Sequence, residues 1–370
     1  MIYFDNAATT YPKPKEVRCA LKYCIKKCGG NPGRSSHTLS EKASEIIYST
    51  REKVAELLHT ENPENVVFTY NATHALNIAI KAYATRACHI ITSDIEHNSV
   101  IRPLEKLKKD LDIEYSVFNS DRDINEVIPP LINDRTTCIV STLASNVTGK
   151  RINISSLSEI ARTRGLYLII DASQAVGHTE INLSETPCDV LCAPAHKALF
   201  GIQGAGFALF RENSRRETLY EGGSGYDSTD TQMPYLLPEG YEAGTLGTPA
   251  IAALGGGIDF VEKTGIEFIE EKIKYLTEKL IERIGSVKGT ILYPSFCGIV
   301  GFNLNNFSSS YTASALATRG ICTRAGLHCA PSAHKKLGTC ERGIVRLSLS
   351  CVNTVRELDV FYKALKDITR

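Results

Sequence analysis

The sequence lacks an excess of charge of either sign. Its 370 residues carry 42 Lys and Arg against 41 Asp and Glu, which gives a formal net charge of +1. Binding to nucleic acid usually needs a basic excess or a basic stripe, and so does binding to an anionic lipid surface. We therefore expect neither nucleic acid nor a membrane surface among the partners of this chain.

Long apolar runs are also missing. No stretch approaches the roughly 20 apolar residues of a transmembrane helix. The first residues, MIYFDNAATTYPKP, are interrupted by Asp5 and Pro12 and so do not form the apolar core of a signal peptide. We expect a cytoplasmic protein. Its hydrophobic content of 43% is ample for packed cores, and its length suggests two domains.

The twelve cysteines include no CxxC pair. Cys24 and Cys28 are not followed by a second pair at the spacing of a zinc site, so we expect helical core thiols and no metal. In a cytoplasmic chain the cysteines are expected to be reduced. Cys192 lies inside a predicted strand and is expected to be packed. Cys329 differs, because it lies between a glycine-containing turn and a proline in RAGLHCAPSAHKKLGT.

Hydrophobic periodicity predicts strands that alternate with helices over the first part of the chain. This alternation is typical of the α/β class, in which helices cover both faces of a mostly parallel sheet. The predicted strands are 66–70, 88–92, 136–143, 166–171 and 189–193, and the predicted helices are 40–58, 71–84, 99–111 and 155–165.

The pattern changes near residue 250, after a loop-rich stretch. We therefore predict a large domain of residues 16–250 and a smaller α+β domain made of residues 1–15 and 251–370. The elements predicted from here on are helices at 247–265, 269–284 and 355–365 and strands at 299–304 and 344–350.

Polar residues follow five of the predicted strands. In open α/β sheets, ligands bind outside the carboxyl ends of the strands, so these residues are the first candidates for a site. Taken singly, each has an ordinary structural explanation, such as a helix cap for Thr73 or a solvated side chain for Lys197. The groups are residues 71–74, 93–97, 144–146, 171–174 and 194–197.

Taken together, the five groups match the needs of one ligand, pyridoxal 5′-phosphate (PLP). Its phosphate needs a hydroxyl and free N–H groups at a helix start. Its pyridine nitrogen needs a carboxylate, its ring a flat partner, its phenolic oxygen amide donors, and its aldehyde a lysine. In that order the candidates are Thr73 with His74, then Asp171, His97, Asn146 with Gln174, and Lys197.

These residues lie in segments that resemble fold-type I PLP enzymes of the class V aminotransferase family, and within it the cysteine desulfurases and selenocysteine lyases. The resemblance implies a large domain with a mostly parallel, seven-stranded type of sheet, a smaller α+β C-terminal domain, and a homodimer with shared active sites. The matching segments, which span nearly the whole chain, are YFDNAATTYPKP, NATHALN, EHNSV, SNVTG, DASQAVGH, HKALFG, YEAGT and RAGLHCAP.

The resemblance also implies roles for single residues. Lys197 matches the lysine that holds the cofactor's aldehyde, Asp171 the partner of the pyridine nitrogen, and His97 the histidine stacked on the ring. Cys329 matches the nucleophilic cysteine, and Arg346 matches the arginine that binds the substrate's α-carboxylate. The remaining matches are Thr73, His74 and His196 at the phosphate, Thr245 at the phosphate of the other subunit, and Gln174 and Asn146 around the ring oxygen and the substrate. Apart from these matches, Arg324 is expected to add positive charge near the cysteine loop and to help bind the substrate.

The sequence departs from the family pattern in places. Pro194 stands where the family usually has a Ser or Thr that contacts the phosphate, so that hydrogen bond is missing or is supplied elsewhere. Ile202 follows Gly201 where the family commonly has a proline, and the loop 222–230 has an atypical composition to which we assign no role.

The implied function is that of a group II-like cysteine desulfurase. Such an enzyme converts L-cysteine to L-alanine, takes the sulfur as a persulfide on Cys329 and passes it to an acceptor protein. His328 is a candidate for activating the Cys329 thiol, although neighbours in a loop point in different directions. L-selenocysteine is an alternative substrate, for which Cys329 would matter less.

Three other interpretations stay open at this point. Another PLP enzyme of this family, such as an aminotransferase, epimerase or different lyase, would need Lys197 and Asp171 but not Cys329. A PLP-binding scaffold for sulfur transfer would need no turnover. A plain α/β protein without a cofactor would require the polar groups at five strand ends to be a coincidence.

Overall fold

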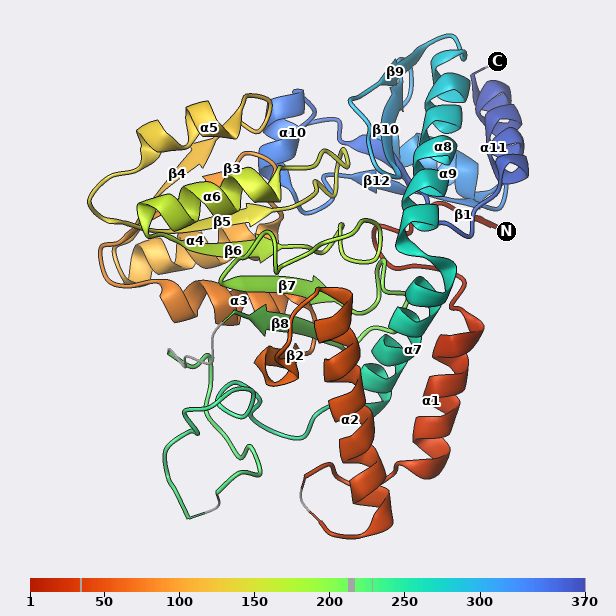
Figure 1. The fold of residues 1–370 in the computed structure, drawn as a ribbon. Coiled ribbons are helices and arrows are strands. Elements are labelled where there is room, and N and C mark those ends of the chain that lie inside the picture. Colours follow the sequence, from red (N-terminus) through yellow and green to blue (C-terminus); the bar gives the residue numbers. More distant parts are fainter. Residues whose placement is uncertain (34, 212–216, 228, 370) are drawn as a thin grey trace.

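A computed structural model of the chain describes residues 1–33, 35–211, 217–227 and 229–369. Its largest sheet has the strand order β2-β8-β7-β6-β5-β3-β4 (Figure 1). Strands β3 to β7 pair in parallel, whereas β8 pairs antiparallel with β7 and β2, so the predicted mostly parallel sheet is confirmed. The strands are β2 (Val66–Thr69), β3 (His89–Ser93), β4 (Glu114–Phe118), β5 (Thr136–Thr142), β6 (Tyr167–Asp171), β7 (Val190–Pro194) and β8 (Gly206–Phe210).

Helices cover both faces of this sheet. Helices α3 and α4 pack on one face, and α2, α6 and α7 contribute to the core on the other. The parallel strands β3, β5, β6 and β7 are largely buried and each carries Val, Ile or Leu, as expected for parallel strands between two helical layers. The helices are α2 (Thr38–Leu57), α3 (Ala72–Tyr83), α4 (Asn98–Asp110), the short α5 (Ile124–Val127), α6 (Ile154–Arg164) and α7 (Thr248–Thr264).

The smaller part of the molecule is built on an antiparallel sheet with the order β12-β13-β10-β9. Phe4, Phe302 and Phe361 meet edge to face in its core. Both chain ends lie on this side (Figure 1). A two-stranded parallel pair joins β1 to β11. The elements are β1 (Ile2–Tyr3), α8 (Ile266–Gly285), β9 (Thr290–Leu292), β10 (Ile299–Leu304), α9 (Ser309–Ala317), β11 (Ile321–Cys322), β12 (Arg324–Gly326), α10 (Pro331–Leu337), β13 (Ile344–Ser348) and α11 (Val355–Ile368).

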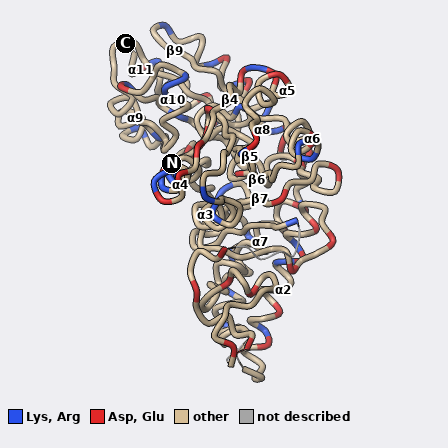
Figure 2. The backbone as a smooth tube through the Cα atoms, turned by 90° about the vertical axis from the view of Figure 1, so that its left-hand side faces the viewer, with Lys and Arg blue, Asp and Glu red and all other residues tan. Residues whose placement is uncertain are grey.

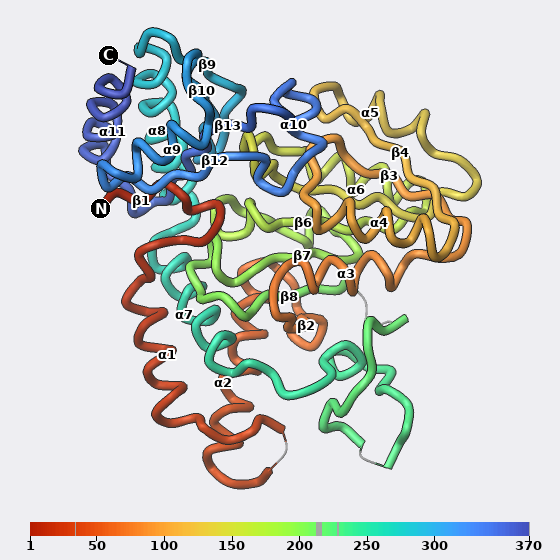
Figure 3. The backbone as a smooth tube through the Cα atoms, turned by 180° about the vertical axis from the view of Figure 1, so that it is seen from behind, coloured from red at the N-terminus to blue at the C-terminus, as the bar shows by residue number. Residues whose placement is uncertain are grey.

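Helix α7 packs against α2 and against α1 (Lys15–Lys27), and the three helices extend together below the large sheet (Figure 3). Glycine permits this close packing. A Cβ at Gly256 would lie 2.8 Å from the Glu16 carbonyl oxygen of α1, and one at Gly255 would lie 2.9 Å from Thr50 Oγ1 of α2. Buried Cys24 of α1 lies in this contact as a helical core thiol, as predicted. The predicted domain boundary near residue 250 stays a prediction.

Charged residues are spread along the chain. In the view of Figure 2, Lys and Arg are interspersed with Asp and Glu over most elements. Within the described residues, no helix combines the length and the apolar character that a membrane span requires.

Candidate active site

A cavity of about 220 Å³ opens at the carboxyl ends of the parallel strands. One water molecule needs only roughly 10–15 Å³, so the cavity has room for a small organic molecule. All five predicted strand-end groups reach its wall, and so do six residues of the segments 1–15 and 251–370. The candidate residues on the wall are Thr73, His97, Asn146, Asp171, Gln174, His196, Lys197, Arg324, Cys329 and Arg346.

Lys197 and Asp171 form the charged centre of this cavity. Asp171 is the last residue of β6, and its Oδ1 accepts a hydrogen bond of 2.9 Å from the Ser173 N–H. Burial lowers the pKa of Lys197 to about 8, although the Asp171 carboxylate favours the charged amine. Lys197 therefore holds an amine that gives up its proton near neutral pH, as a base or nucleophile requires.

The ring of His97 caps the start of α4. Its Nδ1 accepts the Ser99 N–H at 3.0 Å as a helix cap, so the ring proton of the neutral form is on Nε2. The Ser99 hydroxyl bonds to the Thr73 hydroxyl at 2.7 Å. Burial lowers the pKa of His97. A neutral, oriented imidazole therefore lies beside the start of α3, where free N–H groups and hydroxyls favour an anion.

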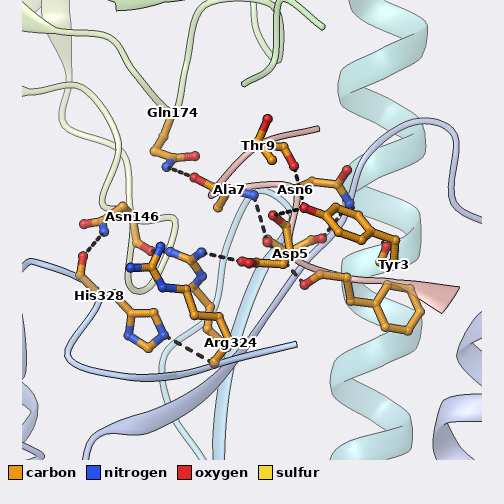
Figure 4. Close-up of polar contacts among 12 residues, drawn as sticks. Tyr3, Asp5, Asn6, Ala7, Thr9, Asn146, Gln174, Arg324 and His328 are labelled. Atoms are coloured by element: carbon orange, nitrogen blue, oxygen red, sulfur yellow. Dashed lines mark hydrogen bonds and ion pairs between the residues drawn. The ribbon is translucent and has the colours of Figure 1, made fainter. Parts of the chain in front are cut away.

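Arg346 lies on β13, directly opposite Arg324 on β12. Its guanidinium donates to Asp5 Oδ1 at 2.9 Å and to the Asn146 carbonyl at 2.9 Å. Figure 4 shows Asp5, Asn146, Arg324 and His328 gathered in this region. Among the described residues, the ion pairs of these two arginines involve one carboxylate, that of Asp5, so the corner is suited to an anionic substrate group. Asp5 had no predicted role.

The N-terminal segment lies over the lysine loop. Gln174 donates from Nε2 to the Ala7 carbonyl at 3.0 Å. The hydroxyls of Thr9 and Thr10 donate to the carbonyls of His196 (3.1 Å) and Lys197 (3.0 Å). The N-terminal segment and the loops that follow the large sheet therefore both shape the cavity.

Cys329 is exposed and lies in a tight turn at the cavity. The Ala330 N–H bonds to the Leu327 carbonyl at 3.0 Å, and the two residues between them, His328 and Cys329, have φ values of +52° and +57°. Positive φ at both central positions is typical of a type I′ turn, which favours glycine and asparagine. A histidine and a cysteine there each cost about 1–3 kcal/mol, which surrounding contacts must offset.

His328 does not supply a positive charge at the cysteine turn. Burial lowers its pKa to about 2, with the Arg346 charge acting in the same direction. Its ring lies nearly parallel to that of His334, with 5.6 Å between the ring centroids and 3.4 Å between His328 Nδ1 and His334 Nε2. His328 is therefore neutral at physiological pH and supplies no positive charge to Cys329.

Two candidate residues lie elsewhere. His74 and Thr245 line a neighbouring pocket, where the His74 ring stacks between Tyr70 and Tyr220. Thr245 is exposed. Their predicted phosphate contacts stay predictions. Pro194 does line the main cavity, as the last residue of β7. Of the loop 222–230, residue 228 lies outside the described residues.

Glu96, next to His97, is fully buried, and no cation pairs with its carboxyl group within the described residues. Its Oε1 accepts the Thr142 N–H at 2.8 Å and a Ser93 hydroxyl, while Oε2 has no hydrogen-bond partner in the described part of the chain. Burial raises its pKa to about 8. The EHNSV segment contains this residue, but its neutral state depends on burial that the sequence does not show.

We expect Glu96→Gln to flatten the pH dependence of stability. The unfolded pKa is 4.5, so between pH 4.5 and about 8 the folded protein keeps a proton that the unfolded chain loses. The stabilisation is complete below pH 4.5 and falls by up to about 1.4 kcal/mol per pH unit as the pH rises through this window. Glutamine keeps the acceptor and removes the titration. Urea unfolding at about pH 5, 6.5 and 8 measures the slope.

Glu242→Gln is the matched control for this experiment. Glu242 is also buried, but it pairs with Arg51 at 2.5 Å and accepts the Phe68 N–H at 2.6 Å. Its replacement leaves a buried guanidinium without its counter-ion and should destabilise the protein over the whole pH range. An unchanged pH slope in Glu96→Gln would show that Glu96 is ionised in the folded protein.

The chemistry of the cavity fits PLP. Within the described residues, three buried polar atoms at its wall have no hydrogen-bond partner: Asn146 Oδ1, His196 Nδ1 and Arg346 Nε. Buried polar atoms are normally paired, so unpaired ones around a cavity indicate a polar ligand. A carboxylate, a flat neutral imidazole, a helix start and an amine of low pKa complete the set that this cofactor needs.

Comparisons with known proteins agree with this chemistry. The sequence model of the family described as aminotransferase class-V matches residues 2–361. A protein of Methanothermobacter thermautotrophicus named as a probable cysteine desulfurase is 30% identical, over 99% of this chain and 94% of that protein. A cysteine desulfurase of Salmonella agona is 28% identical, over 100% and 94%. The apo structure of a cysteine desulfurase from Thermococcus onnurineus has a TM-score of 0.89 at 27% identity, over 99% and 94%.

Proposed function

Since the chain belongs to the class V aminotransferase family, we propose that it is a PLP-dependent cysteine desulfurase that converts L-cysteine to L-alanine and takes the sulfur as a persulfide on Cys329. One observation supports this activity over others in the family. An exposed cysteine lies on the wall of the same cavity as Lys197 and Arg346. An aminotransferase or an epimerase has no use for a thiol at this place.

The geometry of the cavity supports an assignment of the residues that would hold the cofactor. Lys197 would hold the aldehyde end, Asp171 the pyridine nitrogen, and His97 the ring face. The start of α3 at Thr73, together with His196, would hold the phosphate. When bound, PLP supplies an electron sink that stabilises negative charge on the substrate's α-carbon.

The chain's own residues then perform binding, proton transfer and sulfur capture. Arg346 binds the carboxylate of L-cysteine and so orients the substrate sulfur towards Cys329. The Lys197 amine removes the α-proton and later returns a proton to carbon. The Cys329 thiolate attacks the substrate sulfur, so an S–S bond forms, the C–S bond breaks with its electron pair left on carbon, and carbon takes a proton. The sum is L-cysteine plus a thiol giving L-alanine plus a persulfide.

Further parts of this proposal concern partners and location. Thr245 is exposed beside His74, where a second copy of the chain would bring it to a neighbouring active site in a homodimer. The persulfide needs an acceptor, for which an acceptor protein is the candidate. A cytoplasmic location suits twelve free cysteines.

The test is alanine formation by the loaded enzyme. We expect L-cysteine to yield alanine and a sulfur adduct on the peptide that carries Cys329, and Cys329→Ala to form alanine at least roughly 10²-fold more slowly. Cys340→Ala is the matched control, because Cys340 is also an exposed thiol, just after α10. Undiminished alanine formation in Cys329→Ala would exclude the cysteine as nucleophile.

Selenocysteine is the second substrate in the same experiment. Alanine formed from L-selenocysteine by Cys329→Ala at the unmutated rate, with L-cysteine a poor substrate throughout, would favour a selenocysteine lyase.

A further inference from the structure

A chain of buried hydrogen bonds runs behind the Cys329 turn. Thr339 Oγ1 lies 2.7 Å from His334 Nδ1, His334 Nε2 lies 3.4 Å from His328 Nδ1, and His328 Nε2 lies 3.4 Å from the Arg324 carbonyl. The three side chains are buried, and His334 is 0% exposed. The chain connects the end of α10, the cysteine turn and strand β12.

The direction of this chain follows from its last member. A carbonyl oxygen only accepts, so His328 Nε2 carries the proton and His328 Nδ1 is an acceptor. His334 Nε2 must then donate, which leaves His334 Nδ1 to accept from the Thr339 hydroxyl. Each ring carries one proton and both are neutral. Burial lowers the pKa of both histidines, which is consistent with this arrangement.

The backbone of the turn is also attached to the segments that follow strands β3 and β5. The Cys329 carbonyl accepts the Asn98 N–H at 2.7 Å, and the His328 carbonyl accepts from Asn146 Nδ2 at 2.7 Å. On the far end of α10, Lys336 Nζ lies 2.8 Å from Asp94 Oδ2 and 2.7 Å from Asp121 Oδ2. These contacts fix the backbone of the turn and its neighbours, but none of them involves the ring of His328.

We propose that His334 is a positioning residue for Cys329: oriented by Thr339, it fixes the ring of His328 and thereby keeps the left-handed turn that presents the thiol to the cavity. His334 is five residues from the cysteine in sequence, and its ring contacts His328 without lining the cavity. It acts on Cys329 only through His328. The kinetic test of this proposal rests on the proposed function, whereas the test by thiol reactivity does not.

The kinetic test compares His334→Phe with His334→Gln in the PLP-loaded enzyme. Phenylalanine keeps a flat ring but donates nothing, so we expect kcat for alanine formation to fall by roughly 10- to 100-fold with little change in KM, because a small misplacement of a reacting group has effects of this size. Glutamine provides an N–H near the position of Nε2 and an oxygen for Thr339, so it should recover most of kcat.

His89→Phe is the control for general damage to the core. His89 is 2% exposed and is also held on both ring nitrogens, by Thr136 at 2.8 Å and Ser116 at 2.9 Å, at the opposite ends of the strands. Its replacement should lower stability without changing kcat. If His334→Phe does not fold, Thr339→Val removes the orienting hydroxyl and should lower kcat in the same direction.

The second readout is the reactivity of the thiols. Alkylation by iodoacetamide, followed by peptide mass, gives the rate at Cys329 relative to that at exposed Cys340. We expect this ratio to change by at least about threefold in His334→Phe and to return in His334→Gln, since the turn relaxes without its support. This result stands even if the protein proves not to be a desulfurase. An unchanged ratio with unchanged kcat, or equal losses in His334→Phe and His334→Gln, would overturn the proposal.

Discussion

Lys197→Ala should abolish alanine formation from L-cysteine, with a loss of at least roughly 10³-fold. Lys197 lines the cavity and its amine has a pKa of about 8, so it is the group that we propose to move the proton at the substrate's α-carbon. It would also hold the cofactor. The variant should therefore lose PLP during gel filtration, which absorbance of the protein fraction measures independently of turnover.

Lys13→Ala is the matched control, because burial also lowers the pKa of Lys13 to about 8. Its Nζ lies 3.0 Å from Thr10 Oγ1 and 3.3 Å from the His196 carbonyl, on the outer side of the lysine loop. We expect Lys13→Ala to retain PLP and to keep its rate within about tenfold of the unmutated protein. Partial recovery of Lys197→Ala by added methylamine would support proton transfer by the amine. Equal losses in both variants would show that the low pKa marks burial and not catalysis.

The sequence was sufficient to predict the groups at the five strand ends. The strands before them are short apolar runs, the helices after them are periodic, and parallel strands bring their carboxyl ends to one edge. These are local patterns combined with one general rule, and the structure places ten of the candidate residues on one cavity wall.

Strands β4 and β8 were not predicted, for different physical reasons. β4 is an edge strand with two exposed positions out of five, so its pattern is weakly apolar. β8, GFALF, is apolar but runs antiparallel between β2 and β7. Its pairing depends on contacts with residues far away in the sequence, which a local pattern does not reveal.

The electrostatic details of the site also depend on distant contacts. Asp5 and Arg346 are 341 positions apart. His328 was a candidate for activating Cys329 because the two are neighbours in sequence, but burial and the nearby Arg346 charge lower its pKa and keep it neutral. Burial likewise decides the protonation of Glu96 and Lys197. Residue types predict which chemistry is possible, whereas the folded environment decides the charge.

Arg346→Ala should raise KM for L-cysteine by roughly 10²-fold, because a charge-assisted pair with the substrate carboxylate contributes about 1.5–3 kcal/mol. Arg346→Lys keeps the charge without the planar fork and should raise KM by about tenfold. Arg324→Ala should have a smaller effect, since Arg324 is only partly buried whereas Arg346 is 1% exposed and already oriented by Asp5 and Asn146.

Cysteamine separates carboxylate binding from general damage, because it is cysteine without the carboxylate. If Arg346 binds that group, the unmutated enzyme discriminates strongly against cysteamine and Arg346→Ala loses most of the discrimination, even if both rates fall. Stability must be measured in parallel, since removing Arg346 leaves the carboxylate of Asp5 without its 2.9 Å partner. Asp5→Asn in the Arg346→Ala background should restore that stability without restoring KM. Discrimination that survives in Arg346→Ala would assign the carboxylate to Arg324 and leave Arg346 with the structural task of joining Asp5 to Asn146.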